Sequence, residues 1–241
     1  MLVALTALLG SDYQLADIGD AFEKLGSVAK YADVRLQAAS TGQLLPEPPH
    51  ILADLTTVKL GLLTTLTYEV LLVTVVGGAS RQTFMGLVRA LGLDHYSASR
   101  LWRPGLAVIA CYLLVGLYVV VVGALGIDFL KPRSTVPDAI TRDAGTLAVG
   151  LVVAVVAAPL SEELFFRGFI FGGLLRWGFW PAALVASAGF TLAHLDVGSM
   201  IPFFGVGLVL AWLYWSRATL WDSIAFHFMF NFISFALLMA R

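Results

Sequence analysis

The chain has 241 residues, of which 59% are hydrophobic and 13% are charged, whereas a typical soluble domain is roughly 25% charged. Its 15 lysines and arginines nearly balance its 16 acidic residues, which excludes a nucleic-acid-binding protein because that class needs a basic excess. The single cysteine, Cys111, lies in an apolar run and excludes a disulfide-stabilised scaffold. We therefore predict an all-helical polytopic membrane protein.

The first 54 residues differ from the rest of the chain. Residues 2–9 are apolar but too short to span a membrane, and no basic residue precedes them as in a signal peptide. Residues 10–45 mix apolar and charged positions, which predicts an amphipathic segment at the surface, and three prolines then break the chain before residue 50. We divide the chain into 1–54 (surface segment), 55–144 (first spans and loops) and 145–241 (second membrane region).

Six apolar segments are candidates to cross a bilayer core of about 30 Å. They are residues 55–77, 104–126, 145–176, 181–195, 198–216 and 218–240. The third would measure about 48 Å as one helix, and Pro159 interrupts it. We predict one kinked or tilted span there rather than two crossings.

Loop charges predict how the bundle is oriented. The 78–103 loop carries four arginines and one acidic residue, so the positive-inside rule places it in the cytoplasm. Alternating crossings then put Arg176 and Arg217 on the same side. The basic residues of the 127–144 loop argue in the opposite direction; they are Lys131, Arg133 and Arg142.

Several ionisable residues lie inside predicted spans, where each costs about 2.5–3.5 kcal/mol on insertion scales and is therefore a candidate for function. The polar residues that share the last spans are Glu162, Glu163, Arg167, His194, His227 and Asn231. Glu69 lies inside the first span, either as a packing contact or as part of a pocket.

The spacing of these residues suggests a division of roles. Glu163 and Arg167 are four residues apart, so their side chains share a helical face and can pair. Glu162 points about 100° away, which leaves its carboxylate free to act as a general base. His227 and Asn231 repeat the four-residue spacing on another helix, as do Phe190 and His194 on a third.

The number of residues between each polar group and the end of its span predicts that the polar groups of these helices lie at a similar depth in the membrane. From the presumed cytoplasmic ends, Glu162, His194 and His227 lie roughly 15–23 Å deep at 1.5 Å per residue. The glycines of Gly168-x-x-x-Gly172 would let another helix backbone approach closely. The pattern predicts a water-filled pocket within the membrane.

Three motifs resemble those of one family. Glu162-Glu163-x-x-x-Arg167 resembles the EExxxR motif of the CPBP family (CAAX proteases and bacteriocin-processing enzymes, also called Abi). Phe190-x-x-x-His194 is similar to its FxxxH motif, and His227-x-x-x-Asn231 to its HxxxN motif. The three occur in the family's order, on three separate predicted helices.

The resemblance implies an intramembrane endopeptidase similar to the type II CAAX prenyl endopeptidases, with 145–241 as its catalytic core. In that family the residues corresponding to Glu162 and His194 activate the attacking water. Those corresponding to His227 and Asn231 stabilise the oxyanion. Amide hydrolysis needs such a base and such donors.

The resemblance also implies that Glu163 and Arg167 orient the site. Glu162, His194 and His227 could instead form a zinc set with one open position. However, the H-E-x-x-H sequence is absent, and pairing with Arg167 disfavours cation binding by Glu163. We expect glutamate catalysis without a metal or cofactor.

The expected substrate is a membrane-associated protein or peptide, including lipidated ones, cleaved by CAAX-type or leader processing. The expected location is a cell membrane, and the Ala/Gly/Leu/Val-rich composition suggests a bacterial cytoplasmic one. Two alternatives stay open: a non-proteolytic family member acting in bacteriocin immunity or as a scaffold, and a proton-coupled transporter. A transporter would be expected to show internal repeats, and we find none. Taken singly, each motif could also be a structural ion pair or an interhelical hydrogen bond.

Overall fold

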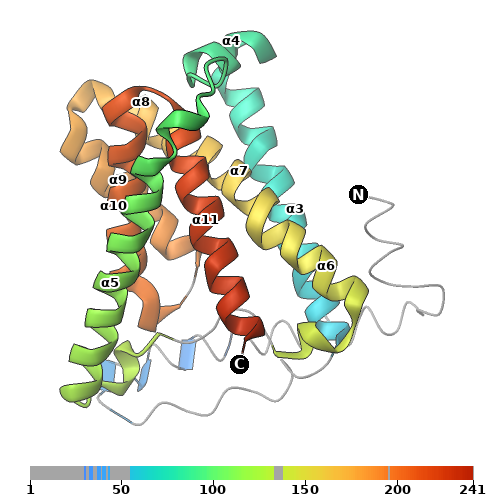
Figure 1. Cartoon of the computed structure of the whole chain (residues 1–241), viewed down its shortest axis with the longest axis vertical. Coiled ribbons are helices and arrows are strands. Elements are labelled where there is room, and N and C mark those ends of the chain that lie inside the picture. Colours follow the sequence, from blue (N-terminus) through green and yellow to red (C-terminus); the bar gives the residue numbers. More distant parts are fainter. Residues whose placement is uncertain are drawn as a thin grey trace.

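The computed structural model describes residues 55–132, 138–194 and 196–240, together with a few positions between 30 and 43. This part of the chain is a bundle of helices without strands (Figure 1), so the predicted all-helical class is confirmed. The amphipathic segment predicted at 10–45 lies almost entirely outside the described residues.

The helices follow one another closely along the chain. The first part contains α3 (Leu55–Ser80), α4 (Phe84–Ala90), η2 (Ala98–Arg100), α5 (Trp102–Ala124), η3 (Asp128–Leu130) and η4 (Asp138–Arg142). A continuous helical stretch comprises α6 (Ala144–Val152), η5 (Val153–Ala157), α7 (Ala158–Glu162), η6 (Glu163–Phe171), α8 (Gly172–Leu174) and η7 (Leu175–Trp177). The last part contains α9 (Phe179–Ala193), η8 (Val197–Ser199), α10 (Met200–Arg217) and α11 (Leu220–Met239).

Five helical stretches are long and apolar enough to cross a membrane. They are Val58–Ser80, Ala98–Ala124, Ala144–Trp177, Val197–Arg217 and Leu220–Met239. The segment predicted at 181–195 is α9, an apolar helix of only 15 residues. The protein is thus a multi-pass membrane protein, and its described residues contain five helical stretches long enough to span and one shorter apolar helix.

The Ala144–Trp177 stretch is one uninterrupted helical path, as predicted for 145–176. It is capped at its start by Asp143, whose carboxylate accepts a 2.7 Å hydrogen bond from the Thr146 amide. A hydrogen bond from the Thr146 hydroxyl, together with this one, lowers the pKa of Asp143. Its backbone widens into π-helical turns in η5 and η6, on either side of α7. The first widening precedes Pro159, which lacks an N–H and crowds the turn before it.

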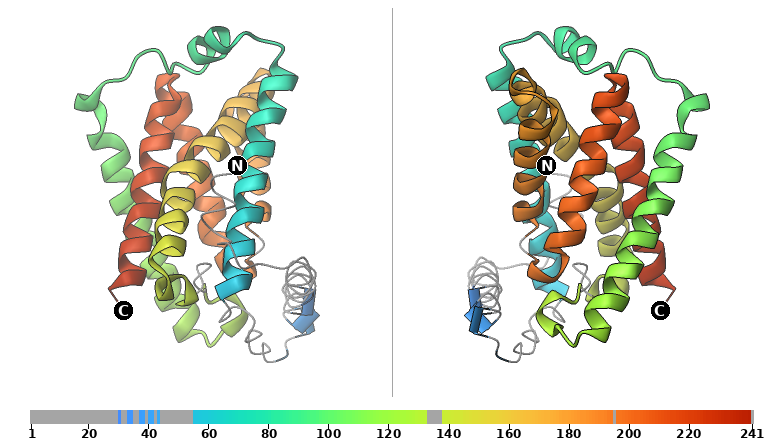
Figure 2. Two further views of the ribbon diagram at one scale, coloured as in Figure 1. Left: turned by 90° about the vertical axis from the view of Figure 1, so that its right-hand side faces the viewer. Right: turned by 90° about the vertical axis from the view of Figure 1, so that its left-hand side faces the viewer.

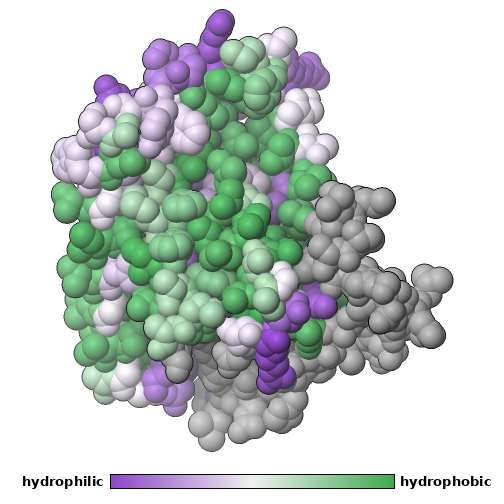
Figure 3. Space-filling view, turned by 45° about the vertical axis from the view of Figure 1, so that its right-hand side comes forward, coloured by the Kyte–Doolittle hydropathy of each residue, from purple (hydrophilic) through white to green (hydrophobic). Residues whose placement is uncertain are grey.

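Apolar side chains cover the middle of the bundle. Large ones on α5 are mostly exposed, including Leu113 and Val120. Figure 3 shows the same feature on one face, where hydrophobic residues form a broad band and hydrophilic residues gather toward the ends. Such a surface suits contact with lipid, because lipid solvates apolar side chains while helices satisfy their own backbone groups.

Both side views show one end of the bundle closed by the segment between α3 and α5 (Figure 2). There the Leu220 amide donates to the Leu91 carbonyl at 2.9 Å, and the Trp221 indole donates to the Leu93 carbonyl at 2.9 Å. These bonds place the start of α11 and the 78–103 loop at the same end, as alternating crossings require. Which end faces the cytoplasm stays a prediction.

The close helix approach predicted at Gly168 and Gly172 is wrong. A Cβ at Gly168 would meet the Leu91 side chain at 2.9 Å, so a loop side chain rather than a helix backbone covers that position. The close approach lies at Gly207 of α10, where a Cβ would be 2.8 Å from Ser187 Cβ in α9. Small residues at this crossing allow α9 and α10 to pack tightly.

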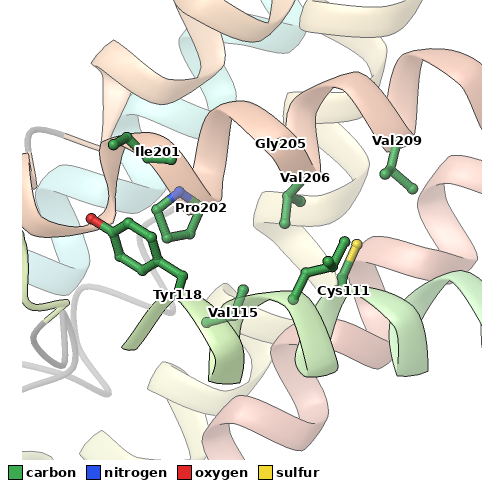
Figure 4. A pocket seen from close by; sticks show the side chains of 9 residues that line it. Cys111, Val115, Tyr118, Ile201, Pro202, Gly205, Val206 and Val209 are labelled. Carbon is green, nitrogen blue, oxygen red and sulfur yellow. The ribbon is translucent and has the colours of Figure 1, made fainter. Parts of the chain in front are cut away.

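An apolar groove lies between α5 and α10 (Figure 4), with a volume of about 180 Å³. It is lined by Cys111, Leu114, Val115, Tyr118, Ile201, Pro202, Gly205, Val206 and Val209. None of the polar residues singled out from the sequence lines it.

Candidate active site

All six polar residues of the three motifs lie in the described part of the chain, on three helical stretches. Glu162 is the last residue of α7, and η6 contains Glu163 and Arg167. His194 is the C-terminal cap of α9. His227 and Asn231 lie on α11. The contact between Glu163 and His227 joins η6 to α11. The ring of Phe190 in α9 contacts Arg167 of η6 and His227 of α11. Four of the six polar residues are buried: Glu162, Glu163, Arg167 and His227.

Glu163 lies at the centre of this cluster. Its Oε1 accepts a 2.9 Å hydrogen bond from Arg167 Nη1, so the pairing predicted from the four-residue spacing is present. The same oxygen lies 2.9 Å from His227 Nδ1. Neither the Glu163 nor the Arg167 side chain has exposed surface. A buried charge pair without water depends on such partners.

Arg167 connects this pair to two further helices. Its Nη2 donates to the Gly207 carbonyl of α10 at 3.4 Å, and its guanidinium lies 4.3 Å from the ring centroid of Phe190 in α9. A cation over an aromatic face is attracted by the ring quadrupole. Arg167 therefore ties η6 to the tight α9–α10 crossing.

Glu162 differs from its neighbour. Its side chain is directed toward His227, with 4.0 Å between Glu162 Oε2 and His227 Nε2, which is too long for a direct hydrogen bond. This oxygen is buried and has no hydrogen-bond partner among the described residues. The arrangement matches the expectation that one carboxylate is paired and the next is left free.

His194 is fixed by the backbone of its own helix. Its Nδ1 lies 2.8 Å from the Phe190 carbonyl oxygen, and its ring packs 4.6 Å from the ring centroids of Phe190 and Phe203. Because a carbonyl can only accept, Nδ1 carries the proton. The other ring nitrogen, Nε2, keeps its lone pair and can accept a proton.

His227 is fixed by a carboxylate. A carboxylate paired with arginine accepts hydrogen bonds, so His227 Nδ1 donates to Glu163. Its Nε2, the atom nearest Glu162, can therefore donate only when the ring is positively charged. The two site histidines thus have the same tautomer when neutral but different partners.

Asn231 lies one turn after His227 on α11. Its Nδ2 donates to the Ala154 carbonyl of η5 at 2.7 Å. This bond uses one of the two amide protons and leaves the other for a further acceptor. Asn231 and His227 both contact the Ala144–Trp177 stretch, which explains their spacing along one helical face.

The structure adds two residues that the motifs do not include. Glu69 of α3 is only 3% exposed and shares a short hydrogen bond with Ser161, the residue before Glu162. The sequence signal for Glu69 was its charge inside an apolar span, but the sequence did not indicate its partner. Glu69 therefore brings the first span into contact with the site.

The acidic and imidazole groups are not arranged as a metal-binding set. In the described ranges, no three or more His, Cys, Asp or Glu side chains are grouped so that they could hold a metal ion.

The fold and this site define a multi-pass helical membrane protein with a buried glutamate–arginine–histidine cluster. Residues 144–233 match the family model "Type II CAAX prenyl endopeptidase Rce1-like". This segment contains all three motifs, so the resemblance found in the sequence is confirmed.

Two curated proteins are similar to the chain over shorter regions. "Putative membrane peptidase YdiL" of Bacillus subtilis (strain 168) is 32% identical over 82 residues, which cover 34% of this chain and 34% of that protein. "UPF0177 protein YxdF" of Lactococcus lactis subsp. lactis (strain IL1403) is 31% identical over 77 residues, or 32% of this chain and 42% of that protein. The chain thus matches less than half the length of either relative. No solved structure matches it.

Proposed function

We propose that this protein is an intramembrane endopeptidase that hydrolyses a peptide bond in a membrane-associated protein or peptide. The observation that carries the proposal is the buried, unpartnered Glu162 oxygen beside a network of Glu163, Arg167 and His227. An unpaired carboxylate held near fixed donors is what water activation and oxyanion stabilisation require.

In the proposed mechanism, Glu162 and His194 activate water. Glu162 takes a proton from the water that attacks the peptide carbonyl, and the lone pair of His194 Nε2 orients the same water. The bond from His194 Nδ1 to the Phe190 carbonyl supports this role, because it leaves Nε2 as an acceptor. Glu162 then returns the proton to the leaving amine.

The oxyanion that forms is stabilised by His227 and Asn231. His227 acts in its positively charged form, since Nδ1 already donates to Glu163 and only the charged ring can donate from Nε2. Asn231 donates with its second amide proton, while the first holds η5. The Glu163–Arg167 pair orients the His227 ring through the contact of the Glu163 carboxylate with Nδ1, and the positive charge of His227 is opposed by the developing oxyanion.

The proposal assigns no metal or cofactor to the reaction. It is supported by Glu163, whose oxygen is bonded to Arg167 Nη1 and His227 Nδ1. Protein stripped of metal with a strong chelator should cleave at the same rate as untreated protein, and added zinc should not raise that rate. A loss of cleavage restored by zinc would contradict this part of the proposal.

The proposed substrate class follows the family description, which names prenyl endopeptidases. Lipidated protein C-termini and membrane-anchored leader peptides are both candidates, and a bacterial cytoplasmic membrane is the proposed location. The match to a peptidase family favours hydrolysis over transport or a purely scaffolding role.

The activity test uses the full chain reconstituted in phosphatidylethanolamine–phosphatidylglycerol vesicles. The probes are two peptide libraries, one carrying a C-terminal isoprenoid and the other a transmembrane helix, with products identified by mass spectrometry. His194→Ala should lower the cleavage rate by about 10²–10⁴-fold, the range for a lost acid–base partner. His95→Ala is the matched control, because the His95 side chain is 83% exposed and pairs with Asp94, away from the site residues. Equal loss in both variants would contradict the assignment.

A further inference from the structure

Glu69 is a buried carboxyl outside the segment that matches the peptidase family. It lies in the middle of α3, within the Val58–Ser80 span, and α3 packs against α7 and η6. An ionised side chain in a span is costly unless it is paired with an opposite charge or lines water. The partner of Glu69 among the described residues is Ser161, a neutral hydroxyl.

The hydrogen bonds of Ser161 indicate the protonation state of Glu69. Ser161 Oγ contacts a Glu69 carboxyl oxygen and also lies 2.7 Å from the Ala157 carbonyl oxygen. A hydroxyl has one proton, and a carbonyl can only accept. If Ser161 donates to Ala157, both contacts are hydrogen bonds only when Glu69 is protonated and donates to Ser161. If Glu69 is ionised, Ser161 must share its single proton between the Glu69 carboxylate and the Ala157 carbonyl, which leaves at least one of these close contacts poorly bonded.

The charges around Ser161 require a proton on one of two carboxyls, Glu69 or Glu162, and the contacts of Ser161 favour Glu69. Three carboxyls are buried in this region, Glu69, Glu162 and Glu163, while Arg167 is the only lysine or arginine among the buried residues that the structure describes. Arg167 forms its ion pair with Glu163. Glu69 and Glu162 are close enough for their charges to interact. Two like carboxylates buried in one site do not both ionise, so one of them holds a proton.

We propose that Glu69 is a positioning residue of the site: a protonated carboxyl that donates to Ser161, fixes the helical turn bearing Glu162 and leaves Glu162 as the ionised member of the pair. The inference rests on the proposed function for its catalytic consequence. The hydrogen bond itself joins α3 to α7 whether or not the protein cleaves peptides.

Three single variants of the reconstituted full chain, and one double variant, test whether Glu69 acts through a hydrogen bond or through a negative charge. Glu69→Gln keeps a neutral donor of the same shape and should change kcat by no more than about threefold. Glu69→Ala and Ser161→Ala should each lower kcat by about 10–100-fold through misplacement of Glu162, with little change in KM. The double variant should be no worse than either single one, because both remove the same bond. Val70→Ala is the matched control, since Val70 follows Glu69 on the same helix and its side chain is half exposed.

An infrared measurement tests the protonation state without cleavage. The wild-type protein should show the carbonyl stretching band of a protonated carboxylic acid, and Glu69→Gln should lose one such band. Loss of the band only in Glu162→Gln would overturn the assignment, as would wild-type kcat in Glu69→Ala or equal kcat loss in Glu69→Gln and Glu69→Ala. If no peptide is cleaved but the band belongs to Glu69, the proposed function fails while the protonated Glu69 stands.

Discussion

The two site histidines are held by different acceptors, and this difference separates their chemistry. His194 donates from Nδ1 to a neutral backbone carbonyl, whereas His227 donates from Nδ1 to a carboxylate. A carboxylate stabilises the positively charged ring far more than a carbonyl does. His194 is therefore suited to accept a proton, and His227 to donate in its charged form.

Arg167 should be the residue on which the stability of the site depends most. Arg167→Ala leaves the Glu163 carboxylate buried without its cation, so we expect a loss of about 3–5 kcal/mol in the free energy of unfolding. Denaturant unfolding in detergent micelles, followed by circular dichroism, measures the change.

The double variant Glu163→Gln with Arg167→Met provides the control. It removes both charges and keeps the volume filled, so it should recover part of the stability that Arg167→Ala loses. An unchanged midpoint for Arg167→Ala would show that the pair does not stabilise the fold.

The residue-level pairing was predictable where the helix alone determines it. Glu163 and Arg167 are four residues apart, and helical geometry places them together. Contacts between distant segments were not predictable, because they depend on the rotation and depth of whole helices. His227 reaches Glu163 across 64 residues, and Glu69 reaches Ser161 across 92.

At the scale of elements, the site depends on irregular helix. The π-helical turns of η5 and η6 flank the short α7 that presents Glu162. Each such turn changes the direction of the side chains that follow it. The sequence predicted one continuous span with a proline, but not these turns, because hydropathy does not distinguish π-helical from α-helical backbone.

The α9–α10 crossing offers an element-scale prediction. Gly207→Ala would place its Cβ 2.8 Å from Ser187 Cβ and 3.0 Å from Ser187 Cα. Because helix backbone cannot move as easily as a side chain, we expect the variant to lose about 1–3 kcal/mol of stability, as overpacked interiors do. Thermal unfolding in detergent measures the loss.

Gly116→Ala on α5 is the matched substitution, because a Cβ there meets nothing within 4 Å. It should leave the midpoint unchanged or raise it slightly, since alanine favours helix more than glycine does. Equal effects of the two substitutions would contradict a tight crossing at Gly207.

At the scale of the whole molecule, the outer surface of the bundle is apolar and its interior is polar at the site. Apolar side chains face outward over its middle (Figure 3), while the scarce charges within the spans are turned inward at the site. Hydropathy predicted six spans, in the order in which the structure has five full-length apolar helices and the shorter α9. The short length of α9, which ends at Ala193 with His194 as its C-terminal cap, was not predicted.

Orientation is a prediction about the whole bundle. In a Cys111→Ala background, a cysteine at Ser99 should react with a membrane-impermeant thiol reagent only from the cytoplasmic side. A cysteine at Asp128 should react only from the opposite side. Both positions are exposed: Ser99 lies in η2, at the very start of the Ala98–Ala124 span, and Asp128 lies after its end. The reverse labelling pattern would show that the basic 78–103 loop faces outward.

The central claim is that Glu162 is the base of a hydrolytic site, and its most direct test is the cleavage rate of Glu162→Gln. This change removes the base while it keeps the shape of the side chain. The variant, reconstituted with a peptide that the wild type cleaves, should be slower by about 10²–10⁴-fold, while His95→Ala keeps the wild-type rate. A folded Glu162→Gln protein that cleaves as fast as the wild type would contradict the account.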